Sequence, residues 1–372
     1  MTNPLVRLGE LGQSPWYDFI TRDLVVSGEL ARLIAEDGLR GMTSNPTIFE
    51  KSIAGSRLYD ADIRRLAEEG RGPAAIFEAI AVADVRAACD VFRPLYEASG
   101  GRDGMVSIEV SPTLAHDTEG TIAEAERLWG AIDRPNAMIK IPGTLAGLPA
   151  ITHCIARGIN VNVTLLFAVE RYRAVIDAYL AGLEQRAARG LRLDRVTSVA
   201  SFFVSRVDSK VDPLLDRLAD SGAGERAAAL RSRAAIANAC LAYRAFEASL
   251  AGERWTRLRA LGAAAQRPLW ASTSTKDPRL PDTYYVEALI APETVNTLPP
   301  ETFAAYRDHG APAVRIRAGI EAAPAVLDGL AGLGVSLDAV TRELEEEGVA
   351  KFAASYRSLL EGLEAKVGVL SA

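Results

Sequence analysis

The segment 136–144, NAMIKIPGT, places a lysine inside a short apolar run. The flanking residues predict a buried strand, and Pro142 and Gly143 end this strand soon after Lys140. Burial disfavours an ammonium ion, so a lysine in such a place can serve as a free amine that condenses with a carbonyl group. The alternatives are a structural lysine in a buried ion pair and one whose ammonium group reaches solvent past the strand end.

Lysine is rare in this chain, and this makes its occurrence in an apolar strand informative. Of 42 lysine and arginine residues only six are lysines, namely Lys51, Lys140, Lys210, Lys276, Lys351 and Lys366. Arginine therefore supplies most of the positive charge. Because a guanidinium group stays protonated, a lysine kept at position 140 indicates a need for an amine that can lose its proton.

Glu109, Asn162 and Thr164 fall at similar places in two other predicted strands. The segment GMVSIEVSP alternates in strand fashion and puts Glu109 at a buried position, where a carboxyl group needs a partner or a function. The segment INVNVTL places Asn162 and Thr164, together with Asn160, on one face of an otherwise β-branched strand. Packing alone does not account for three polar residues on one face, so these residues are candidates for a site.

Asp18 and Asn45 are further candidates, and each has a structural alternative. Asp18 lies in the aromatic run SPWYDFI, where it either caps the following helix or joins the site. Asn45 stands before Pro46 in TSNPTIF, and the proline keeps it out of the helical region of backbone conformation. Its amide group can therefore shape the local turn or contact a ligand.

Helices alternate with eight predicted strands along the chain, and this pattern predicts an α/β fold of the (β/α)8 TIM-barrel type. We expect residues 1–372 to form one barrel domain with extra helices after Asn45, after Arg206 and at the C-terminus. An acidic run, 342–347, predicts a solvated helical face. In such a barrel the carboxyl ends of the strands meet at one rim, where chemistry is performed. The residues expected at this rim are Asp18, Asn45, Glu109, Lys140, Thr164, Ser201 and either Ser272 or Lys276.

Composition excludes several classes of function. A net charge of -6 and the lack of a basic block argue against general binding of nucleic acid. The three cysteines and three histidines are scattered without metal-ligand spacing, so we expect reduced thiols and no metal. No leader peptide and no apolar run of membrane-spanning length is evident, which predicts a soluble cytoplasmic protein that does not bind membranes.

Several segments, taken in order, resemble the transaldolase family: GMTSNPTIFEKS, SIEVSP, AMIKIPGT, NVNVTLLF and SFFVSRVD. The length and the segment ASTSTKDP are similar to the longer bacterial branch of that family. The resemblance implies a transferase of the pentose phosphate pathway that works without a metal or organic cofactor. A dihydroxyacetone unit from sedoheptulose 7-phosphate or fructose 6-phosphate is held as a Schiff base on Lys140. The unit then passes to glyceraldehyde 3-phosphate or erythrose 4-phosphate.

The resemblance also implies roles for the residues that match the family's motifs. Glu109 is the acid and base that acts through a water, Thr164 positions that water, and Asp18 takes the proton of the C4 hydroxyl group. The remaining residues bind substrate: Asn45 and Asn162 hold the hydroxyl groups of the dihydroxyacetone unit, Ser201 and Phe203 line the site, and Arg206 holds the phosphate.

Two departures from the family pattern concern charge. Shorter members have a second phosphate-binding arginine where this chain has Ser272-Thr273-Ser274, and we expect Lys276 to supply that charge. A carboxylate usual after the Glu109 strand is also absent. The alternative functions are a Schiff-base sugar-phosphate aldolase without transfer and a non-catalytic barrel that binds sugar phosphates. In each case the partners are small-molecule sugar phosphates, and a homodimer is left open.

Overall fold

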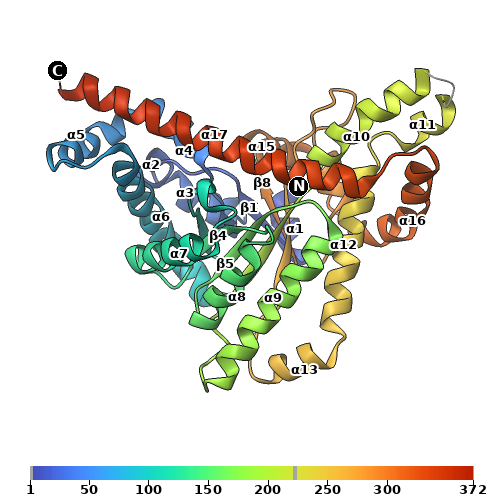
Figure 1. The fold of residues 1–372 in the computed structure, drawn as a ribbon, viewed down its shortest axis with the longest axis horizontal. Helices are drawn as coiled ribbons and strands as arrows, with labels where there is room; N and C mark the ends of the chain where they lie inside the picture. Colours follow the sequence, from blue (N-terminus) through green and yellow to red (C-terminus); the bar gives the residue numbers. More distant parts are fainter. Residues whose placement is uncertain (1–2, 221–223, 372) are drawn as a thin grey trace.

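The computed structural model describes residues 3–220 and 224–371, and within them the chain forms a closed barrel surrounded by helices (Figure 1). All neighbouring strands pair in parallel in the order of the sequence, and β1 pairs with β8 to close the barrel. The expected (β/α)8 architecture is therefore confirmed. The strands are β1 (Gln13–Tyr17), β2 (Gly41–Met42), β3 (Met105–Glu109), β4 (Ala137–Pro142), β5 (Val161–Leu166), β6 (Ser198–Phe203), β7 (Arg267–Ala271) and β8 (Thr294–Leu298).

Helices follow each strand, and further helices lie after Asn45, after Arg206, at the C-terminus and, as α1 (Pro4–Glu10), before the first strand, where the sequence did not predict one. The helices of the first half are α1 (Pro4–Glu10), α2 (Arg22–Val26), α3 (Glu29–Glu36), α4 (Pro46–Ala54), α5 (Asp60–Glu68), α6 (Pro73–Ala98), α7 (Thr118–Ile132) and α8 (Gly147–Arg157), with 3-10 turns η1 (Arg57–Tyr59) and η2 (Pro112–Leu114). Those of the second half are α9 (Val169–Ala188), α10 (Ser205–Leu218), α11 (Gly224–Leu230), α12 (Ala234–Leu250), α13 (Glu253–Ala260), α14 (Tyr284–Ala288), α15 (Pro300–His309), α16 (Ile316–Gly332) and α17 (Leu337–Ser371).

Two boundaries differ from those that the sequence predicts, which are a helix that opens at the capping-box segment TIAE (121–124) and a strand that ends near Ser201. Helix α7 begins at Thr118, three residues before the predicted capping box, because Asp117 accepts a hydrogen bond from the Gly120 amide and caps it first. Strand β6 continues past Ser201 to Phe203. Both shifts are small, and they leave the order of strands and helices unchanged.

The register of the barrel brings three predicted residues to one level. In the pairing of β3 with β4, Glu109 lies opposite Lys140, and in the pairing of β4 with β5, Lys140 lies opposite Asn162. The Asn162 amide nitrogen donates to Ser107 Oγ (3.0 Å), and Ser201 Oγ donates to Asn162 Oδ1 (2.7 Å). Asn162, the middle residue of the polar stripe seen in the sequence, is thus part of a hydrogen-bonded layer inside the barrel, next to the lysine.

The amino-terminal end of the barrel contains a buried polar cluster that we call the floor cluster. It consists of the ion pair of Asp103 with Arg267 and of Ser14, which is hydrogen-bonded to both. The Arg267 guanidinium lies 3.2 Å from Asp103 and donates to Ser14 Oγ at 2.8 Å. Ser14 in turn donates to Asp103 at 2.7 Å. All three side chains are buried. Burial lowers the pKa of Arg267, and the Asp103 carboxylate opposes this effect.

Replacing Asp103 by alanine is expected to lower the free energy of unfolding by about 3 to 5 kcal/mol, because the Arg267 guanidinium then stays buried without a counter-charge. Urea denaturation measures the change. The exposed pair Arg102–Glu293 (2.9 Å) lies nearby and provides the control, since Arg102→Gln should change stability much less. Equal losses in the two variants would show that the floor cluster adds nothing beyond an ordinary surface pair.

Helix α17 crosses the molecule as one long element, from α16 on one side to α5 on the other (Figure 1). It is attached to the barrel by polar contacts along its length. Glu345 pairs with Arg171 of α9 at 3.2 Å, and Glu343 pairs with Lys210 of α10 at 3.0 Å. Farther along, Lys366 pairs with Asp60 at 2.9 Å.

The acidic run 342–347, which the sequence suggested was a solvated face, therefore serves in part to fasten α17 to the barrel. No single helix among the described residues has the length and apolar character needed to cross a membrane. Helices α16 and α17 meet that criterion only as a pair, across a bend of 92°.

Candidate active site

A pocket of about 360 Å3 opens at the carboxyl ends of the strands, where chemistry is found in barrels of this kind. Asp18 follows β1, Asn45 follows β2, and Lys276 follows β7, so loops bring these residues to the rim. The predicted residues that line the pocket are Asp18, Asn45, Lys140, Thr164, Ser201, Phe203, Arg206 and Lys276. Glu109 and Asn162 lie inside the barrel beside this lining and touch Lys140 and Ser201 respectively.

Lys140 is 4% exposed and its amine group is surrounded by fixed partners. The Nζ atom lies 3.2 Å from Glu109 Oε2 and donates to the Ser44 carbonyl oxygen at 3.2 Å. The ring centroid of Phe352, from α17, is 5.6 Å from the same atom. The buried ion pair that the sequence left as an alternative is present, and its carboxylate stands where it can exchange a proton with the amine.

Burial raises the pKa of Glu109, an effect that Lys140 opposes and Asp18 reinforces. A carboxyl group of this kind holds its proton to a higher pH than an exposed glutamate, which suits a residue that must both donate and accept protons. Glu109 Oε1 and Thr164 Oγ1 are buried and make no hydrogen bond within residues 3–220 and 224–371. Both oxygens are therefore free to bond a water or a substrate hydroxyl group.

Asp18 does not cap the helix that follows it, so the capping interpretation is wrong. Thr21 caps α2 instead, since its hydroxyl oxygen accepts from the Asp23 amide at 3.2 Å. Asp18 accepts a hydrogen bond from Thr43 Oγ1 at 2.6 Å, and its pKa is raised by burial, against the opposing charge of Lys140. The carboxyl group of Asp18 therefore lines the pocket, where the charge of Lys140 acts on it.

Asn45 has the structural role that the sequence left open, and it also lines the pocket. Its Oδ1 atom accepts from the Ile48 amide at 3.0 Å and caps α4, while Pro46 occupies the first turn of that helix. The amide nitrogen makes no hydrogen bond within the described part of the chain. One half of the side chain therefore shapes the loop, and the other half remains available at the pocket.

Arg206 lies at the start of α10, between two aromatic rings. Its guanidinium carbon is 4.9 Å from the ring centroid of Phe203 and 6.0 Å from that of Phe352. Burial lowers the pKa of Arg206, and among the described residues no carboxylate lies within ion-pair distance of it. A planar guanidinium held by stacking with its donors unused is suited to an anionic group of a ligand.

Lys276 lies in the loop after β7, where its Nζ atom donates to Ser274 Oγ at 2.7 Å. The adjacent Asp277 pairs with Arg279 at 2.6 Å and with Arg231 at 3.1 Å rather than with the lysine. The charge of Lys276 is therefore not neutralised by its neighbour in sequence and is directed at the pocket that it lines.

Several residues in the pocket or in contact with Lys140 were not found from the sequence. Thr43 Oγ1 lies 2.6 Å from Asp18 Oδ1 and 2.6 Å from Thr297 Oγ1. The carbonyl oxygen of Ser44 accepts the hydrogen bond from Lys140 Nζ. Their position next to Asn45 in the TSNPTIF segment was the signal that could have identified them. Phe352 had no such signal, because its helix reaches the pocket from the far end of the chain.

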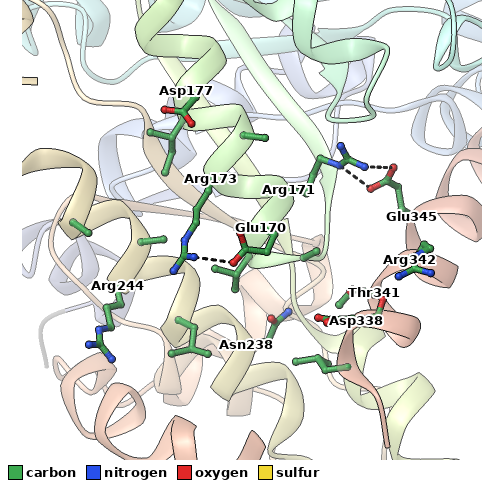
Figure 2. A pocket seen from close by; sticks show the side chains of 18 of the residues that line it. Glu170, Arg171, Arg173, Asp177, Asn238, Arg244, Asp338, Thr341, Arg342 and Glu345 are labelled. Atoms are coloured by element: carbon green, nitrogen blue, oxygen red, sulfur yellow. Dashed lines mark hydrogen bonds and ion pairs between the residues drawn. The ribbon is translucent and has the colours of Figure 1, made fainter. Parts of the chain in front are cut away.

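A larger pocket, of about 1240 Å3, lies outside the barrel among α9, α12, α16 and α17 (Figure 2). Figure 2 shows Arg173 directed at Glu170, and Arg171 directed at Glu345 across the pocket. The lining contains as many carboxylates as arginines, so it has no net charge to attract an ion. The smaller pocket at the strand ends, with its buried amine, is the candidate active site.

A parallel (β/α)8 barrel with a buried amine beside a buried carboxyl group at its rim defines a class of enzymes that activate carbonyl compounds as imines. The family model described as Transaldolase/Fructose-6-phosphate aldolase matches residues 15–363, and the chain belongs to this family. It is 53% identical over 369 residues to the "Transaldolase" of Parafrankia sp. (strain EAN1pec), with 99% of each chain covered. It is 52% identical to that of Thermobifida fusca (strain YX), with 97% of each covered. For the "Transaldolase" of Trichodesmium erythraeum (strain IMS101) the identity is 47%, with 100% of this chain and 99% of the relative covered.

Proposed function

We propose that this chain is a transaldolase of the pentose phosphate pathway. It moves a dihydroxyacetone unit from sedoheptulose 7-phosphate or fructose 6-phosphate to glyceraldehyde 3-phosphate or erythrose 4-phosphate. The observation that carries the proposal is the buried pair of Lys140 and Glu109, 3.2 Å apart, in a pocket that also holds the guanidinium of Arg206, which is unpaired among the described residues. End-to-end similarity to proteins named Transaldolase supports the same conclusion.

The first half of the reaction begins with attack of the Lys140 amine on the C2 carbonyl of the ketose phosphate. The carbinolamine loses water and leaves a protonated imine, and Glu109 supplies and recovers the protons through a water that Thr164 helps to hold. Asp18 then takes the proton of the C4 hydroxyl group, and the C3–C4 bond breaks. Its electron pair moves into the imine to give an enamine, and the aldose phosphate leaves.

The second half reverses these steps with a different aldehyde. The enamine carbon attacks the carbonyl carbon of the acceptor, Asp18 returns its proton to the new hydroxyl group, and water releases the ketose from Lys140. The imine nitrogen thus accepts the electron pair that a metal would otherwise stabilise, so neither a metal nor an organic cofactor takes part. Asn45 and Asn162 hold the hydroxyl groups of the dihydroxyacetone unit during both halves.

Asn162 acts under a constraint, because both ends of its amide are already bonded, to Ser107 and Ser201. One amide N–H remains for the substrate, and the side chain fixes Ser201 at the same time. Phe203 lines the site and stacks on Arg206, which binds the phosphate with Lys276. These assignments make small-molecule sugar phosphates the partners of this cytoplasmic protein, and leave no part for nucleic acid or a membrane.

Dependence of turnover on an acceptor tests the proposal. With fructose 6-phosphate alone the protein should release at most one equivalent of glyceraldehyde 3-phosphate, because the dihydroxyacetone unit stays on Lys140. Addition of erythrose 4-phosphate should give continuous turnover with formation of sedoheptulose 7-phosphate. Continuous release of free dihydroxyacetone without acceptor would identify the Schiff-base aldolase instead, and no reaction at all would favour the binding protein.

Removal of the Arg206 side chain is expected to weaken the use of phosphorylated substrates selectively. A charge-assisted hydrogen-bonded contact contributes about 1.5 to 3 kcal/mol, so Arg206→Ala should lower kcat/KM for fructose 6-phosphate by roughly ten- to a hundredfold, chiefly through KM. The value for unphosphorylated fructose should change little. Arg217, an exposed arginine of the same helix, provides the control variant Arg217→Ala. Equal losses for the two ketoses would show that Arg206 does not bind the phosphate.

A further inference from the structure

The pocket at the strand ends is cationic although the chain as a whole has a net charge of -6. Its lining carries one arginine and two carboxylates, those of Asp18 and Glu301. It also carries four of the six lysines of this lysine-poor chain. The four lysines are Lys51, Lys140, Lys276 and Lys351. Lysine is thus concentrated in one pocket, and Lys51 and Lys351 have no role in the reaction described above.

Lys51 and Lys351 come from two helices that lie against each other over the pocket. Thr47 of α4 donates to Ser355 of α17 at 2.8 Å, and Ser358 donates to Glu50 at 2.6 Å. Lys51 is one helical turn from Thr47, and Lys351 is one turn from Ser355, so each lysine lies on the face of its helix that meets the other helix.

Both of these lysines are exposed at the outer part of the pocket, and neither side chain forms an ion pair or hydrogen bond within residues 3–220 and 224–371. Arg206 is more deeply placed and is held by two rings, 4.9 and 6.0 Å away. Besides Lys140 and Lys276, the pocket therefore has one fixed cation at depth, Arg206, and two flexible cations nearer to its opening. Lysine side chains have a long rotatable stem, so their ammonium groups can follow a ligand in a way that a stacked guanidinium cannot.

The two donors of the proposed reaction require this kind of adjustment. When either donor is bound to Lys140, the C3–C4 bond that breaks lies at the same place in the pocket. Sedoheptulose 7-phosphate has one more carbon between this bond and its phosphate than fructose 6-phosphate has. Its phosphate therefore lies farther out by about one carbon–carbon bond, roughly 1.5 Å. The fixed guanidinium of Arg206 cannot contact both phosphates with the same geometry, and the Lys276 ammonium beside it is bonded to Ser274.

We infer that Lys51 and Lys351 form an adjustable outer contact for the substrate phosphate, which lets one pocket accept both donors and favours the longer one. The inference rests on the proposed transaldolase function. In it, Arg206 and Lys276 meet the phosphate of the six-carbon donor, and Lys51 and Lys351 take a larger share of the phosphate of the seven-carbon donor.

The half-reaction with each donor, measured in a single turnover without acceptor, isolates this contact. The double variant Lys51→Gln/Lys351→Gln should raise the apparent Kd for sedoheptulose 7-phosphate by about tenfold, as expected for the loss of two exposed charge contacts. The increase for fructose 6-phosphate should be severalfold smaller, and that for unphosphorylated fructose should be absent. The rate at saturating donor should stay the same, because neither lysine touches the bond that breaks.

Two further variants separate a phosphate contact from a structural effect. Arg357 lies on α17 outside the pocket lining, so Arg357→Gln makes the same charge change on the same helix and should leave both Kd values unaltered. Lys51→Arg/Lys351→Arg keeps both charges and should recover most of the affinity. Thermal unfolding of each variant verifies that α17 remains in place.

Three results would overturn the inference: no change in either Kd, an equal change for both phosphorylated donors, and an equal change for fructose with and without its phosphate. Absence of any half-reaction in the unmodified protein would instead reject the proposed function itself. The two failures are therefore distinguishable.

Discussion

Borohydride reduction of the protein in the presence of fructose 6-phosphate is expected to attach one three-carbon unit to Lys140 and to no other lysine. Lys140 alone combines burial, a carboxylate at 3.2 Å and a place on a strand inside the barrel. Peptide mapping by mass spectrometry locates the modification. Lys140→Arg should abolish trapping and lower kcat by a factor on the order of 10^4 or more, because a guanidinium stays protonated and cannot form the imine.

Lys276 provides the control for this experiment, since it lines the same pocket and was the other lysine placed at a strand exit. Its ammonium group donates to Ser274 in a loop and has no carboxylate partner within the described part of the chain. Lys276→Ala should therefore still trap the three-carbon unit at Lys140, with a weaker apparent affinity for the phosphorylated donor. A modified peptide that contains Lys276, with Lys140 unmodified, would reject the assignment of the nucleophile.

The residues at the strand ends could be predicted from the sequence, because in a closed parallel barrel the place of a residue along its strand determines where it lies in the fold. Each strand of such a barrel ends at the same rim, so Lys140 and Thr164 could be placed near each other without any knowledge of their contacts. Glu109 and Lys140 are on consecutive strands that pair in sequence order, and their register sets them side by side. The local rules of alternation and strand length were sufficient for this part.

Contacts made by α17 could not be predicted, because no local pattern says where a C-terminal helix will lie. Phe352 covers both Lys140 and Arg206, yet its sequence context is that of an ordinary amphipathic helix. The same holds for the floor cluster, where Arg267 begins a strand whose polar partner Asp103 is 164 residues away. The sequence of either segment alone therefore does not indicate which side chains the tertiary packing brings together.

Asp18 and Asn45 show the limit of the local rules in another way. From the sequence, Asp18 could be interpreted as a helix cap and Asn45, before Pro46, as a residue that shapes the turn. Asn45 does cap its helix, whereas Thr21 takes that role from Asp18. The difference lies in two or three residues of loop length after the strand, which decide which polar side chain reaches the helix end and which stays at the rim.

Glu109→Gln is expected to lower kcat by roughly a hundred- to ten-thousandfold, the usual contribution of a positioned acid and base. The glutamine keeps the volume of the side chain and can still accept a hydrogen bond, but it cannot carry a proton to or from the carbinolamine. Glu124 is the matched control. It is another largely buried glutamate of raised pKa, bonded to the Ser111 amide outside the pocket, and Glu124→Gln should leave kcat unchanged.

The stability of this variant should also respond differently to pH. Because burial raises the pKa of Glu109 above its ordinary value of 4.5, the folded protein binds this proton more tightly than the unfolded chain does. The contribution of Glu109 to stability is therefore fully present below pH 4.5 and is lost as the pH rises through the folded-state pKa. Glu109→Gln removes that loss, so its unfolding midpoint should fall less than that of the unmodified protein over the same rise in pH.

Together the two measurements separate a catalytic from a structural role for Glu109. A large fall in kcat, with thermal unfolding at neutral pH changed by only a few degrees, is the result expected of a proton carrier beside the proposed Schiff-base lysine. Turnover that survives within a few-fold would assign the proton transfer to another group. Asp18 would then be the next to test, because it is the other buried carboxyl group of raised pKa that faces Lys140.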